Sequence, residues 1–413
     1  MKKLIKKLIP KSVLNLYHLS LVWLGSFLYN HPSKKLTIIG ITGTGGKSTT
    51  VHLATQVLEK AFPGQIASLS SIRFKAGKEE WPNMLKMTMP GRMKIQKFLK
   101  KAVKNHCKYA VLEVTSEGIK QNRHRFIEFN GAVFTNLSKE HIEAHKGFEN
   151  YKKAKGELFK ALNESKKQNK FAIINIDDPN AQYFLNIFKG KTYTYAVKNK
   201  QANITPEKIN IETPLPGEFN KYNSLAAAAI GISQGIGTKE IIEALKEVRE
   251  VPGRMELAIG YPFKVFVDYA HTPDSLEKVY TTIKESDLNN NNSKLICVLG
   301  SCGGGRDKWK RPEMGKIASD NCNKIILTNE DPYDENPEKI IQEVKKGIQN
   351  PETEIIIDRR KAINKALSLA KTGDVVAITG KGSEPWMCVA GNKKIPWDDR
   401  KIAKEEYKKI KEK

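Results

Sequence analysis

Short runs of β-branched and apolar residues recur along the chain and alternate with stretches of helical character. In the first half these runs predict strands at residues 36–41, 109–114, 131–135, 171–175 and 192–196. A second series predicts strands at 265–267, 295–299, 324–327, 354–357 and 374–378. Uninterrupted apolar strands separated by helices are typical of parallel sheets that are covered on both faces. The predicted fold class is therefore α/β.

The first of these runs leads directly into a glycine cluster. The sequence KLTIIGITGTGGKSTT, residues 35–50, combines a buried-type strand, a glycine loop, a Lys-Ser pair and a helix-compatible segment. Glycines let backbone N–H groups converge on phosphate oxygens, and the helix N-terminus adds partial positive charge. In this arrangement Lys47 reaches the β- and γ-phosphates, and the Ser48 hydroxyl binds Mg²⁺. The predicted phosphate-binding loop comprises Gly43, Thr44, Gly45, Gly46, Lys47, Ser48 and Thr49.

The loop departs from the common spacing at one position, because Ile41 stands where a glycine usually precedes the lysine by six residues. A tight strand-to-helix turn with a chance Lys-Ser pair is the alternative interpretation.

Pro252 and Gly253 mark the join between the two series of strands. We expect a P-loop ATPase-type parallel sheet domain at residues 36–250, followed by a smaller Rossmann-like α/β domain at residues 251–413.

The composition limits the classes of partner. Of the 413 residues, 39% are hydrophobic, which suffices for sizeable cores, and the net charge is +25. The lysines are spread along the chain without an arginine-rich arm, so a lysine-biased composition and an anionic substrate explain the charge better than nucleic acid does. The five cysteines form no CxxC pair. This pattern predicts reduced thiols in the cytoplasm and excludes a zinc ribbon.

Residues 1–35 differ in composition from the rest of the chain. A lysine-rich start precedes an apolar, aromatic stretch that Asn15, His18 and Ser20 interrupt, so the segment is a poor membrane-spanning helix. It has no small-residue cleavage site of the kind that follows a signal peptide. Two interpretations remain open: a helix packed on the main body, or an amphipathic helix that makes peripheral contact with a membrane surface.

Beyond the phosphate loop, local signatures follow one another in a fixed order. They are LEVTSEGIKQNR (112–123), FTNLSKEHIEAH (134–145), NYKKAKGELF (150–159), GEFNKYNSLAA (217–227), GRME (253–256), VDYAHTPDSLEK (267–278), GRDKWKRPEMG (305–315), TNEDPYDENP (328–337) and GKGSE (380–384). This series resembles the Mur ligases, and most of all the MurE-like members that add the third residue of the peptidoglycan stem peptide. The resemblance covers nearly everything from residue 36 to the end.

The resemblance implies an ATP-dependent ligase. In that family ATP phosphorylates a substrate carboxylate, and the amine of an amino acid attacks the acyl phosphate. Glu113 ends a predicted strand beside the loop, where its carboxylate can join Ser48 in the oxygen-rich shell that Mg²⁺ requires. His141 matches the family's ligand to a second Mg²⁺. Lys155 matches the lysine that family members carry as a carbamate, a carboxylate that can bridge to this second ion.

Further positions match the family's substrate contacts. For the nucleotide-sugar-peptide these are Thr88, Thr115, Ser116, Gln121 and Arg123. Glu117 stands where the family usually has histidine. Asn220 and Asn223 match the adenine end of the ATP site. Arg254, Asp268 and His271, from the C-terminal domain, are expected to complete that site when the domains close.

The amino-acid pocket of the resemblance includes Arg306, Asp331, Tyr333, Gly380 and Glu384. Family enzymes that select meso-diaminopimelate carry Asp-Asn-Pro-Arg, whose arginine pairs with the distal carboxylate. Here the matching residues 330–333 read EDPY. A tyrosine cannot form a bidentate ion pair, so we expect a different amino acid. Asp331 favours one with a cationic side chain, such as lysine.

A second departure concerns the acceptor. Full-length family enzymes hold the UDP portion of their substrate in an N-terminal domain, and about 35 residues before the phosphate loop are too few for it. The sequence therefore predicts a monomeric ligase that joins an amino acid to a muramoyl peptide, with the acceptor held in another way. The alternative acceptors are a lipid-linked muramoyl unit, a folylpolyglutamate or a poly-amino acid. An alternative from another class is a protein that couples ATP to mechanical or nucleic-acid work.

Overall fold

The computed structural model describes residues 11–85, 87–288, 293–349 and 352–412, and these form two compact units. The first unit contains the described part of Met1–Leu137, together with Phe148–Thr213 and Lys221–Val248. The second contains Ser138–Gly147, Pro214–Asn220 and the described part of Arg249–Lys413. Two short segments that precede residue 249 in the chain thus belong to the second unit.

The first unit is built on an eight-stranded sheet in the order β4-β3-β2-β5-β1-β6-β7-β8. Its strands are β1 (Thr37–Thr42), β2 (Ile66–Leu69), β3 (Arg73–Ala76), β4 (Glu79–Pro82), β5 (Tyr109–Glu113), β6 (Gly131–Phe134), β7 (Phe171–Asn175) and β8 (Lys191–Tyr195). The strands β2, β5, β1, β6, β7 and β8 run parallel, whereas β3 and β4 extend the sheet as antiparallel strands. The strand with the phosphate loop lies between β5 and β6.

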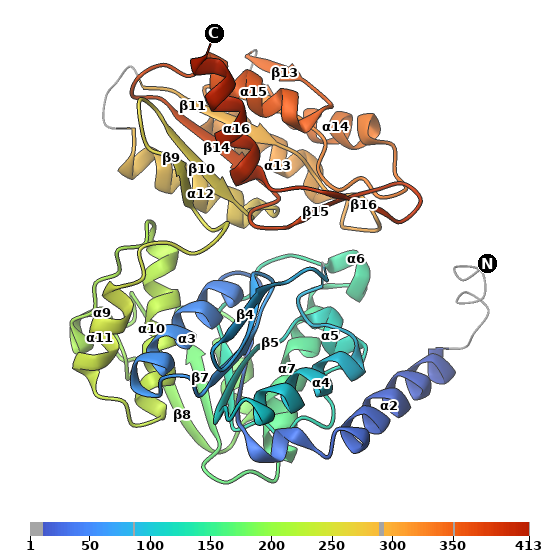
Figure 1. Cartoon of the computed structure of the whole chain (residues 1–413), viewed down its shortest axis with the longest axis vertical. Helices are drawn as coiled ribbons and strands as arrows, with labels where there is room; N and C mark the ends of the chain where they lie inside the picture. Colours follow the sequence, from blue (N-terminus) through green and yellow to red (C-terminus); the bar gives the residue numbers. More distant parts are fainter. Residues whose placement is uncertain (1–10, 86, 289–292, 350–351, 413) are drawn as a thin grey trace. The chain divides into compact units, whose positions relative to one another are not determined.

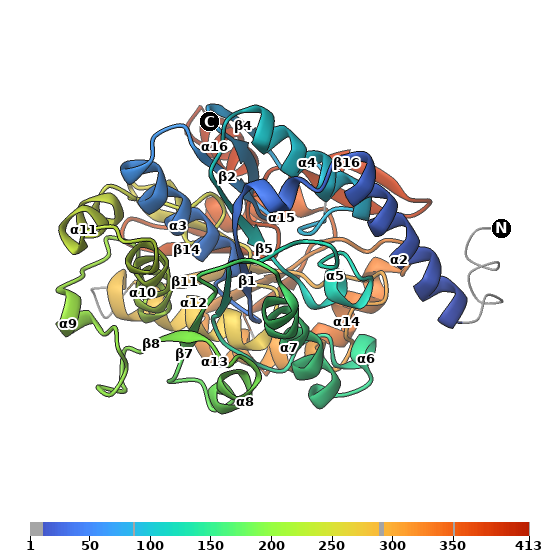
Figure 2. The same ribbon diagram turned by 90° about the horizontal axis from the view of Figure 1, so that it is seen from below.

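Helices cover both faces of this sheet (Figures 1 and 2). One face carries α4 (Arg92–Lys104), α5 (Ser116–Lys120), α7 (Phe148–Glu164) and α8 (Ala181–Ile187). The other carries α3 (Lys47–Ala61), α10 (Glu218–Ser233) and α11 (Thr238–Lys246), and α9 (Pro206–Ile209) precedes α10. Every residue of β5 to β7 except Tyr109 is buried, as expected for strands covered on both faces.

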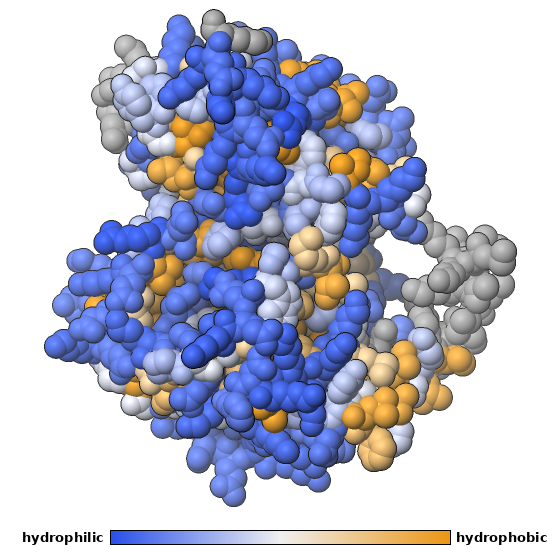
Figure 3. Space-filling view, in the orientation of Figure 1, coloured by the Kyte–Doolittle hydropathy of each residue, from blue (hydrophilic) through white to orange (hydrophobic). Residues whose placement is uncertain are grey.

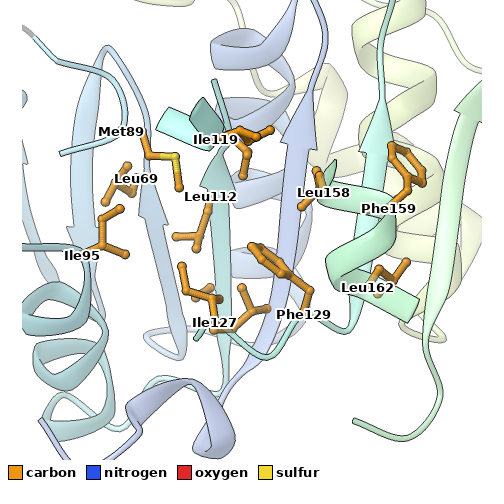
Figure 4. Packing of buried hydrophobic residues seen from close by; sticks show 14 of the residues in the cluster. Leu69, Met89, Ile95, Leu112, Ile119, Ile127, Phe129, Leu158, Phe159 and Leu162 are labelled. Atoms are coloured by element: carbon orange, nitrogen blue, oxygen red, sulfur yellow. The ribbon is translucent and has the colours of Figure 1, made fainter. Parts of the chain in front are cut away.

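The core beneath α4, α5 and α7 shows how the sequence pattern becomes packing (Figure 4). Leu112 of β5 and Phe129 just before β6 meet Leu158 and Leu162 of α7 in one cluster of buried residues. Gly40 of β1 is required there, because a Cβ at this position would lie 2.9 Å from the Leu158 side chain. The close approach places α7 directly against the central strand.

The N-terminal helix α2 (Lys11–Leu28) packs against α4 and is followed by the short 3-10 helix η1 (Pro32–Lys35). A Cβ on Gly25 would lie 3.3 Å from the Cα of Met93 in α4, so the two helices approach closely. The packed-helix interpretation of this segment therefore holds for α2, while residues 1–10 lie outside the described part. Among the described residues, no helix combines the length and apolar character needed to cross a membrane.

The second unit is built on a six-stranded sheet in the order β13-β12-β11-β14-β10-β9. Its strands are β9 (Glu256–Ile259), β10 (Lys264–Asp268), β11 (Leu295–Leu299), β12 (Lys324–Leu327), β13 (Thr353–Ile355) and β14 (Val375–Thr379), with β9 antiparallel to the rest. Its helices are α6 (Ile142–His145), α12 (Pro273–Ser286), α13 (Lys310–Asn321), α14 (Pro337–Lys345), α15 (Arg359–Leu369) and α16 (Asp399–Lys411). A hairpin of β15 (Trp386–Val389) and β16 (Lys393–Pro396) stands apart from the sheet.

The α/β prediction is confirmed, and the ten predicted strands are present with ends shifted by no more than two residues. One expectation about the cysteines is wrong. The Sγ atoms of Cys297 and Cys322 are 2.00 Å apart and form a disulfide, whereas Cys107, Cys302 and Cys388 are free thiols. The bonded pair is separated by 25 residues, and β11 and the end of α13 bring it together. Sequence spacing gave no sign of this pairing.

Candidate active site

Three neighbouring strands of the first sheet end at the phosphate loop. Ile41 of β1 is in register with Glu113 of β5, and Thr42 of β1 is in register with Phe134 of β6. The strands are parallel, so the loop after β1, the carboxylate that ends β5 and the residues after β6 meet at one edge. This arrangement brings Glu113 beside the loop, as the sequence predicts.

The loop is held mainly through its own backbone. Thr44 N donates to Asn136 O over 2.8 Å, and Gly45 N donates to the side-chain oxygen of Asn136 over 2.9 Å. The hydroxyl of Thr135 donates to Gly45 O over 2.7 Å. Lys47 opens α3, and its Nζ donates to Thr44 O over 2.8 Å, so the side chain bends back over the loop.

Two glycines of the loop cannot carry a side chain. Gly46 has φ +79°, and a Cβ there would lie 2.3 Å from Oδ1 of Asn223. A Cβ on Gly43 would lie 1.9 Å from the Thr135 hydroxyl oxygen. By contrast, the atypical Ile41 is a fully buried residue of β1. The position at which a glycine is usual therefore falls in the sheet rather than in the glycine turn.

Ser48 and Glu113 form an oxygen-rich cluster beneath the loop. The Ser48 hydroxyl donates to Glu113 Oε2 over 2.8 Å and lies 2.7 Å from the hydroxyl oxygen of Ser71. The backbone N–H of Ser71 also donates to this carboxylate oxygen, over 3.0 Å. A carboxylate and two hydroxyls are the donor set that suits a hard cation such as Mg²⁺. No group of three or more His, Cys, Asp or Glu in the described residues could hold a metal.

Lys155 projects from α7 into the same region. Its side chain is buried, its Nζ donates to Gly43 O over 2.6 Å, and this atom lies 4.4 Å from the centre of the Tyr151 ring. The Tyr151 hydroxyl is in turn 3.1 Å from that of Thr44. Lys152 and Lys153 of the same helix are not buried, which distinguishes Lys155 from the lysines around it.

His141 belongs to the second unit, in the segment Ser138–Gly147. It precedes α6 with φ +56°. Asp307 fixes this turn by accepting from Ile142 N over 2.9 Å and from Glu143 N over 3.2 Å. Beside it, the buried carboxylate of Glu140 pairs with Lys310 Nζ at 3.0 Å. The segment that carries His141 is therefore anchored to residues 307–310.

The predicted acceptor residues cluster around Arg123. Its guanidinium donates to Gln121 Oε1 over 2.7 Å and to the backbone oxygen of Met89. Thr88 lies between Met87 and Met89. The sulfur of Met87 and the backbone oxygen of Met89 both accept from Arg123. Thr115 caps α5 by accepting from Gly118 N over 3.1 Å, and Ser116 is the first residue of that helix. Four of the five predicted positions thus lie in α5 or within three residues of its ends, and Thr88 lies between two residues that contact Arg123.

The residues expected at the adenine end of the nucleotide site, and those expected to complete that site, divide between the units. Asn223 belongs to the first unit, where it contacts Gly46 and accepts from the Thr50 hydroxyl over 3.4 Å. Asn220 belongs to the second unit and donates to Pro216 O. Also in the second unit, the guanidinium of Arg254 lies 4.2 Å from the Tyr269 ring centre.

Asp268 and His271 lie at the end of β10. The Asp268 carboxylate accepts from Met255 N and Ala270 N, and desolvation raises the pKa of this carboxyl. His271 Nδ1 is 2.8 Å from Tyr269 O. Desolvation, together with the charge of Lys310, lowers the pKa of His271 well below its usual value, so the imidazole is neutral at pH 7.

Lys381 holds the predicted amino-acid pocket together, although the sequence analysis passed over it. Its side chain is fully buried, and its Nζ donates to both carboxylate oxygens of Asp331 over 2.9 Å and to Glu384 Oε2 over 2.7 Å. It also donates to Trp386 O over 2.7 Å. Asp331 Oδ1 additionally accepts from Cys388 N. A substrate ammonium would have to compete with Lys381 for Asp331.

Tyr333 stands next to this cluster in a left-handed backbone conformation, with φ +53°. Its ring lies against Gly304, because a Cβ on that glycine would be 2.5 Å from it. Desolvation, with the charge of Asp331, raises the pKa of Tyr333, so the phenol stays neutral. The charge of Arg306 acts on Tyr333 in the opposite sense, which places this guanidinium within electrostatic range.

Glu330 and Gly380 complete this part of the second unit. The Cys302 thiol donates to Glu330 Oε1 over 2.7 Å. Desolvation raises the pKa of the buried Glu330 carboxyl. A Cβ on Gly380, whose φ is +107°, would lie 2.4 Å from Glu330 Oε2, so only glycine fits.

The structure adds Ser71, Asn136, Tyr151 and Lys381 to the predicted residues. Asn136 follows β6, which pairs with β1. A prediction that placed β6 beside β1 would have indicated Asn136 as a neighbour of the loop. Ser71 lies between β2 and β3, and neither strand was predicted. Lys381 sits inside the GKGSE signature but matched no expected substrate contact.

The fold and this loop define a nucleotide-binding α/β enzyme of the P-loop type. Two family models match the chain: the Mur ligase middle domain at residues 41–231, and the Mur ligase, glutamate ligase domain at residues 253–382. The chain belongs to the Mur ligase family and is an ATP-dependent acid–amino-acid ligase.

Curated relatives support this membership over nearly the whole chain. The UDP-N-acetylmuramoyl-L-alanyl-D-glutamate–2,6-diaminopimelate ligase of Bacillus velezensis is 38% identical over 400 residues, covering 92% of this chain and 80% of the relative. The enzyme of the same name from Syntrophomonas wolfei is 37% identical over 410 residues, covering 94% and 81%.

Solved structures agree. A ligase of that same name superposes with a TM-score of 0.59 at 29% identity, covering 91% of this chain and 78% of that one. A folylpolyglutamate synthase of Mycobacterium tuberculosis gives a TM-score of 0.67 at 16% identity, covering 88% and 92%, which shows a shared fold alone.

Proposed function

We propose that this protein forms an amide bond between a muramoyl-peptide cell-wall precursor and an amino acid, with ATP as the energy source. The observation that carries the proposal is the convergence of Lys47, Ser48 and Glu113 at one sheet edge. Family membership and the names of the relatives support the choice of precursor. ATP would phosphorylate the acceptor carboxylate, and the incoming amine would then displace phosphate from the acyl phosphate.

The chain's own residues divide this work. Lys47 would bind the β- and γ-phosphates, since an ammonium at the start of α3 adds to the positive end of the helix. Ser48 and Glu113 would hold Mg²⁺, which neutralises phosphate charge, and the remaining ligands would come from phosphate and water. His141 would serve a second Mg²⁺. Arg254, Asp268 and His271 would complete the nucleotide site, as the resemblance implies.

Lys155 fits the role of a carbamylated lysine. Reaction with CO₂ would convert the amine of this buried side chain into an anionic carbamate, whose oxygens suit a cation site. Burial of Lys155 and the contact of Nζ with the phosphate loop support this assignment. The exposed neighbour Lys153 offers no such environment.

A screen for phosphate release tests the proposed function. Purified protein with ATP and Mg²⁺ would be given UDP-muramoyl peptides, lipid-linked muramoyl peptides and folylpolyglutamates, each crossed with a panel of amino acids. We expect turnover that needs both a muramoyl peptide and an amino acid, with the coupled product seen by mass spectrometry. Turnover with folylpolyglutamate alone would identify another acceptor, and stimulation by DNA or RNA without acceptor would overturn the ligase assignment.

We further propose that the added amino acid is not meso-diaminopimelate, although the relatives are named for 2,6-diaminopimelate. At the position that matches the family's arginine, Tyr333 presents a neutral phenol. An unpaired buried carboxylate costs about 3–5 kcal/mol. A basic or neutral side chain avoids this cost, although a cationic one would meet an Asp331 that already binds Lys381.

The kcat/KM values for L-lysine, meso-diaminopimelate and small neutral amino acids decide this point. We expect meso-diaminopimelate to be the poorest of the three classes. Arg306 lies near Tyr333 and is the cation that could replace the missing arginine. A preference for meso-diaminopimelate that disappears in Arg306→Gln would show that Arg306 does so. Either result leaves the ligase assignment intact.

We propose a cytoplasmic site of action, where ATP is available, and a monomeric enzyme. Peripheral membrane contact by residues 1–35 is compatible with this function.

A further inference from the structure

The helix α2 carries large apolar side chains on the face that points away from the protein. Leu16, Tyr17, Trp23, Leu24, Phe27 and Leu28 have exposed fractions of 38% to 67%. We call these six residues the apolar stripe. At 100° per residue they fall within an arc of about 140° on one side of the helix. Figure 3 shows apolar side chains gathered over α2.

The opposite face of α2 is already occupied. Val22, Gly25 and Ser26 are buried, and Gly25 is in close approach to α4. The helix is therefore fixed to the first unit by one face and presents the other outward. Trp23 and Phe27 are one turn apart and stacked, with ring centres 6.0 Å apart, so they offer a single aromatic surface. Contiguous exposed apolar surfaces of this kind mark interaction sites.

The charges that flank the apolar stripe along the sequence are of one sign. Lys2, Lys3, Lys6, Lys7 and Lys11 precede it in the sequence, and Lys34 and Lys35 follow it. No Asp or Glu occurs before Glu59. The exposed residues of the neighbouring helix α4 include Lys94 and Lys97.

From these observations we infer that α2 docks the protein on an anionic membrane surface, with the apolar stripe in the interface and the net positive charge of the flanking sequence attracted to lipid phosphates. An amphipathic helix with a basic surround binds in this way, and Trp and Tyr favour the interfacial region. A second copy of the chain is a poorer occupant, because a two-fold contact through the stripe would bring the same lysines together.

This inference does not depend on the proposed function, and a vesicle assay without ATP tests it. Full-length protein would be sedimented with vesicles of phosphatidylcholine, with or without phosphatidylglycerol, at low and high salt. We expect binding to the anionic vesicles that weakens as salt screens the lysines. The variant Trp23→Ser/Phe27→Ser should bind about tenfold more weakly or worse, since each lost aromatic removes apolar burial in the interface.

The matched control is Tyr261→Ser, which removes an aromatic residue of the second unit that is 78% exposed. We expect this control to bind vesicles like the parent protein. All three proteins should keep the same melting temperature, because the substituted side chains are exposed. A second readout is quenching of tryptophan fluorescence by brominated lipid, which Trp23→Phe should abolish while binding persists.

Two outcomes would overturn the inference. One is an absence of binding to anionic vesicles at low salt. The other is a dimer in lipid-free solution that Trp23→Ser/Phe27→Ser converts to a monomer, which would identify a second copy as the occupant of the apolar stripe.

Discussion

The phosphate loop of the first unit and the Lys381 cluster of the second unit are both built where parallel strands of a sheet end, but they are held in different ways. The loop is fixed through peptide groups, to which Asn136, Thr135 and Lys155 bind. The cluster is fixed through a side-chain charge, because one buried ammonium binds the carboxylates of Asp331 and Glu384.

The difference explains which of the two sites can be recognised in a sequence. A loop held through its backbone needs residues that can adopt its conformation. The glycines within residues 43–46 therefore make such a loop recognisable in the sequence. A shape held by a charge depends on partners that are far apart along the chain, here 50 residues for Asp331 and Lys381. Substitutions should separate the two cases. A substitution in the phosphate loop should lower activity without unfolding the protein, whereas a substitution of Lys381 should lower stability.

The largest effect is expected for Lys47→Ala. The loop keeps its backbone bonds to Asn136, so the fold should survive, while ATP turnover should fall by about 10²–10³-fold or more because a charge partner of the transferred phosphate is lost. Steady-state phosphate release and a thermal melt measure the two quantities. The control is Lys60→Ala in the same helix, whose exposed ion pair with Glu247 should contribute little. Near-parental turnover in Lys47→Ala would disprove the site assignment.

A smaller loss, about 10–100-fold, is expected for Lys155→Ala if this lysine carries a carbamate that supports a cation. Short carboxylates such as acetate should partly restore turnover by occupying the same position. Independently of activity, ¹³C-bicarbonate should give a carbamate signal by NMR in the parent and in Lys153→Ala, and none in Lys155→Ala. An unmodified Lys155 in active enzyme would rule the carbamate out.

The variant Lys381→Met tests the charge-held site. Removing the ammonium leaves the buried Asp331 carboxylate without its main partner, which should lower the free energy of unfolding by about 3–5 kcal/mol. Denaturant unfolding followed by tryptophan fluorescence reports this, with the exposed Lys371→Met as control. The double variant Lys381→Met/Asp331→Asn should recover part of the loss. A Lys381→Met protein of parental stability would mean that the cluster is not a structural element.

A still smaller effect concerns pH and the first unit. His52 of α3 is buried, and desolvation, assisted by Arg73, lowers its pKa from 6.5 to about 3. The folded protein thus binds fewer protons than the unfolded chain between these values, so this stabilising contribution is complete above about pH 6.5 and decreases as pH falls toward 3. Acidification from pH 7 to 5 should cost about 2 kcal/mol from this residue.

The variant His52→Leu removes this titration, so its unfolding free energy should depend less on pH than that of the parent. His124 is a second buried histidine of the first unit, and desolvation lowers its pKa to about 4. It should leave a residual slope of the same sign. Equal slopes in parent and His52→Leu between pH 5 and 7 would show that folding does not lower the pKa of His52.

Much of the fold could be predicted because parallel strands are continuous apolar runs with glycine or polar residues at their ends. Three of the strands that escaped prediction, β3, β4 and β16, have a different physical basis, whereas β2 is a buried parallel strand of only four residues. In β4 and β16 all or most residues are exposed, and β3 alternates, so none shows an apolar run. Their pairing depends on neighbours in the sheet or hairpin rather than on local composition.

For the candidate site, local motifs located the loop and Glu113, and order along the chain located the residues around Arg123. Most of the contacts that were missed link distant segments. The side chain of Asp307 fixes the segment that carries His141, over 165 residues. Such pairings follow from tertiary packing, and no local pattern near Asp307 or His141 indicates them.

The two edges of the first sheet are closed to the addition of another strand. At one edge, β4 presents Glu79 and Glu80 to solvent and ends in Pro82, and the carboxylates pair with Lys101 and Arg73 across neighbouring elements. At the other edge, Ile204 bonds the backbone of Thr194 and Ala196, and the Asn203 side chain accepts from Thr194 N. Charged residues, proline and local capping are the devices by which natural sheets avoid edge-to-edge aggregation. Concentrated protein should therefore resist fibril formation through this sheet. Any self-association should instead depend on the exposed apolar stripe of α2.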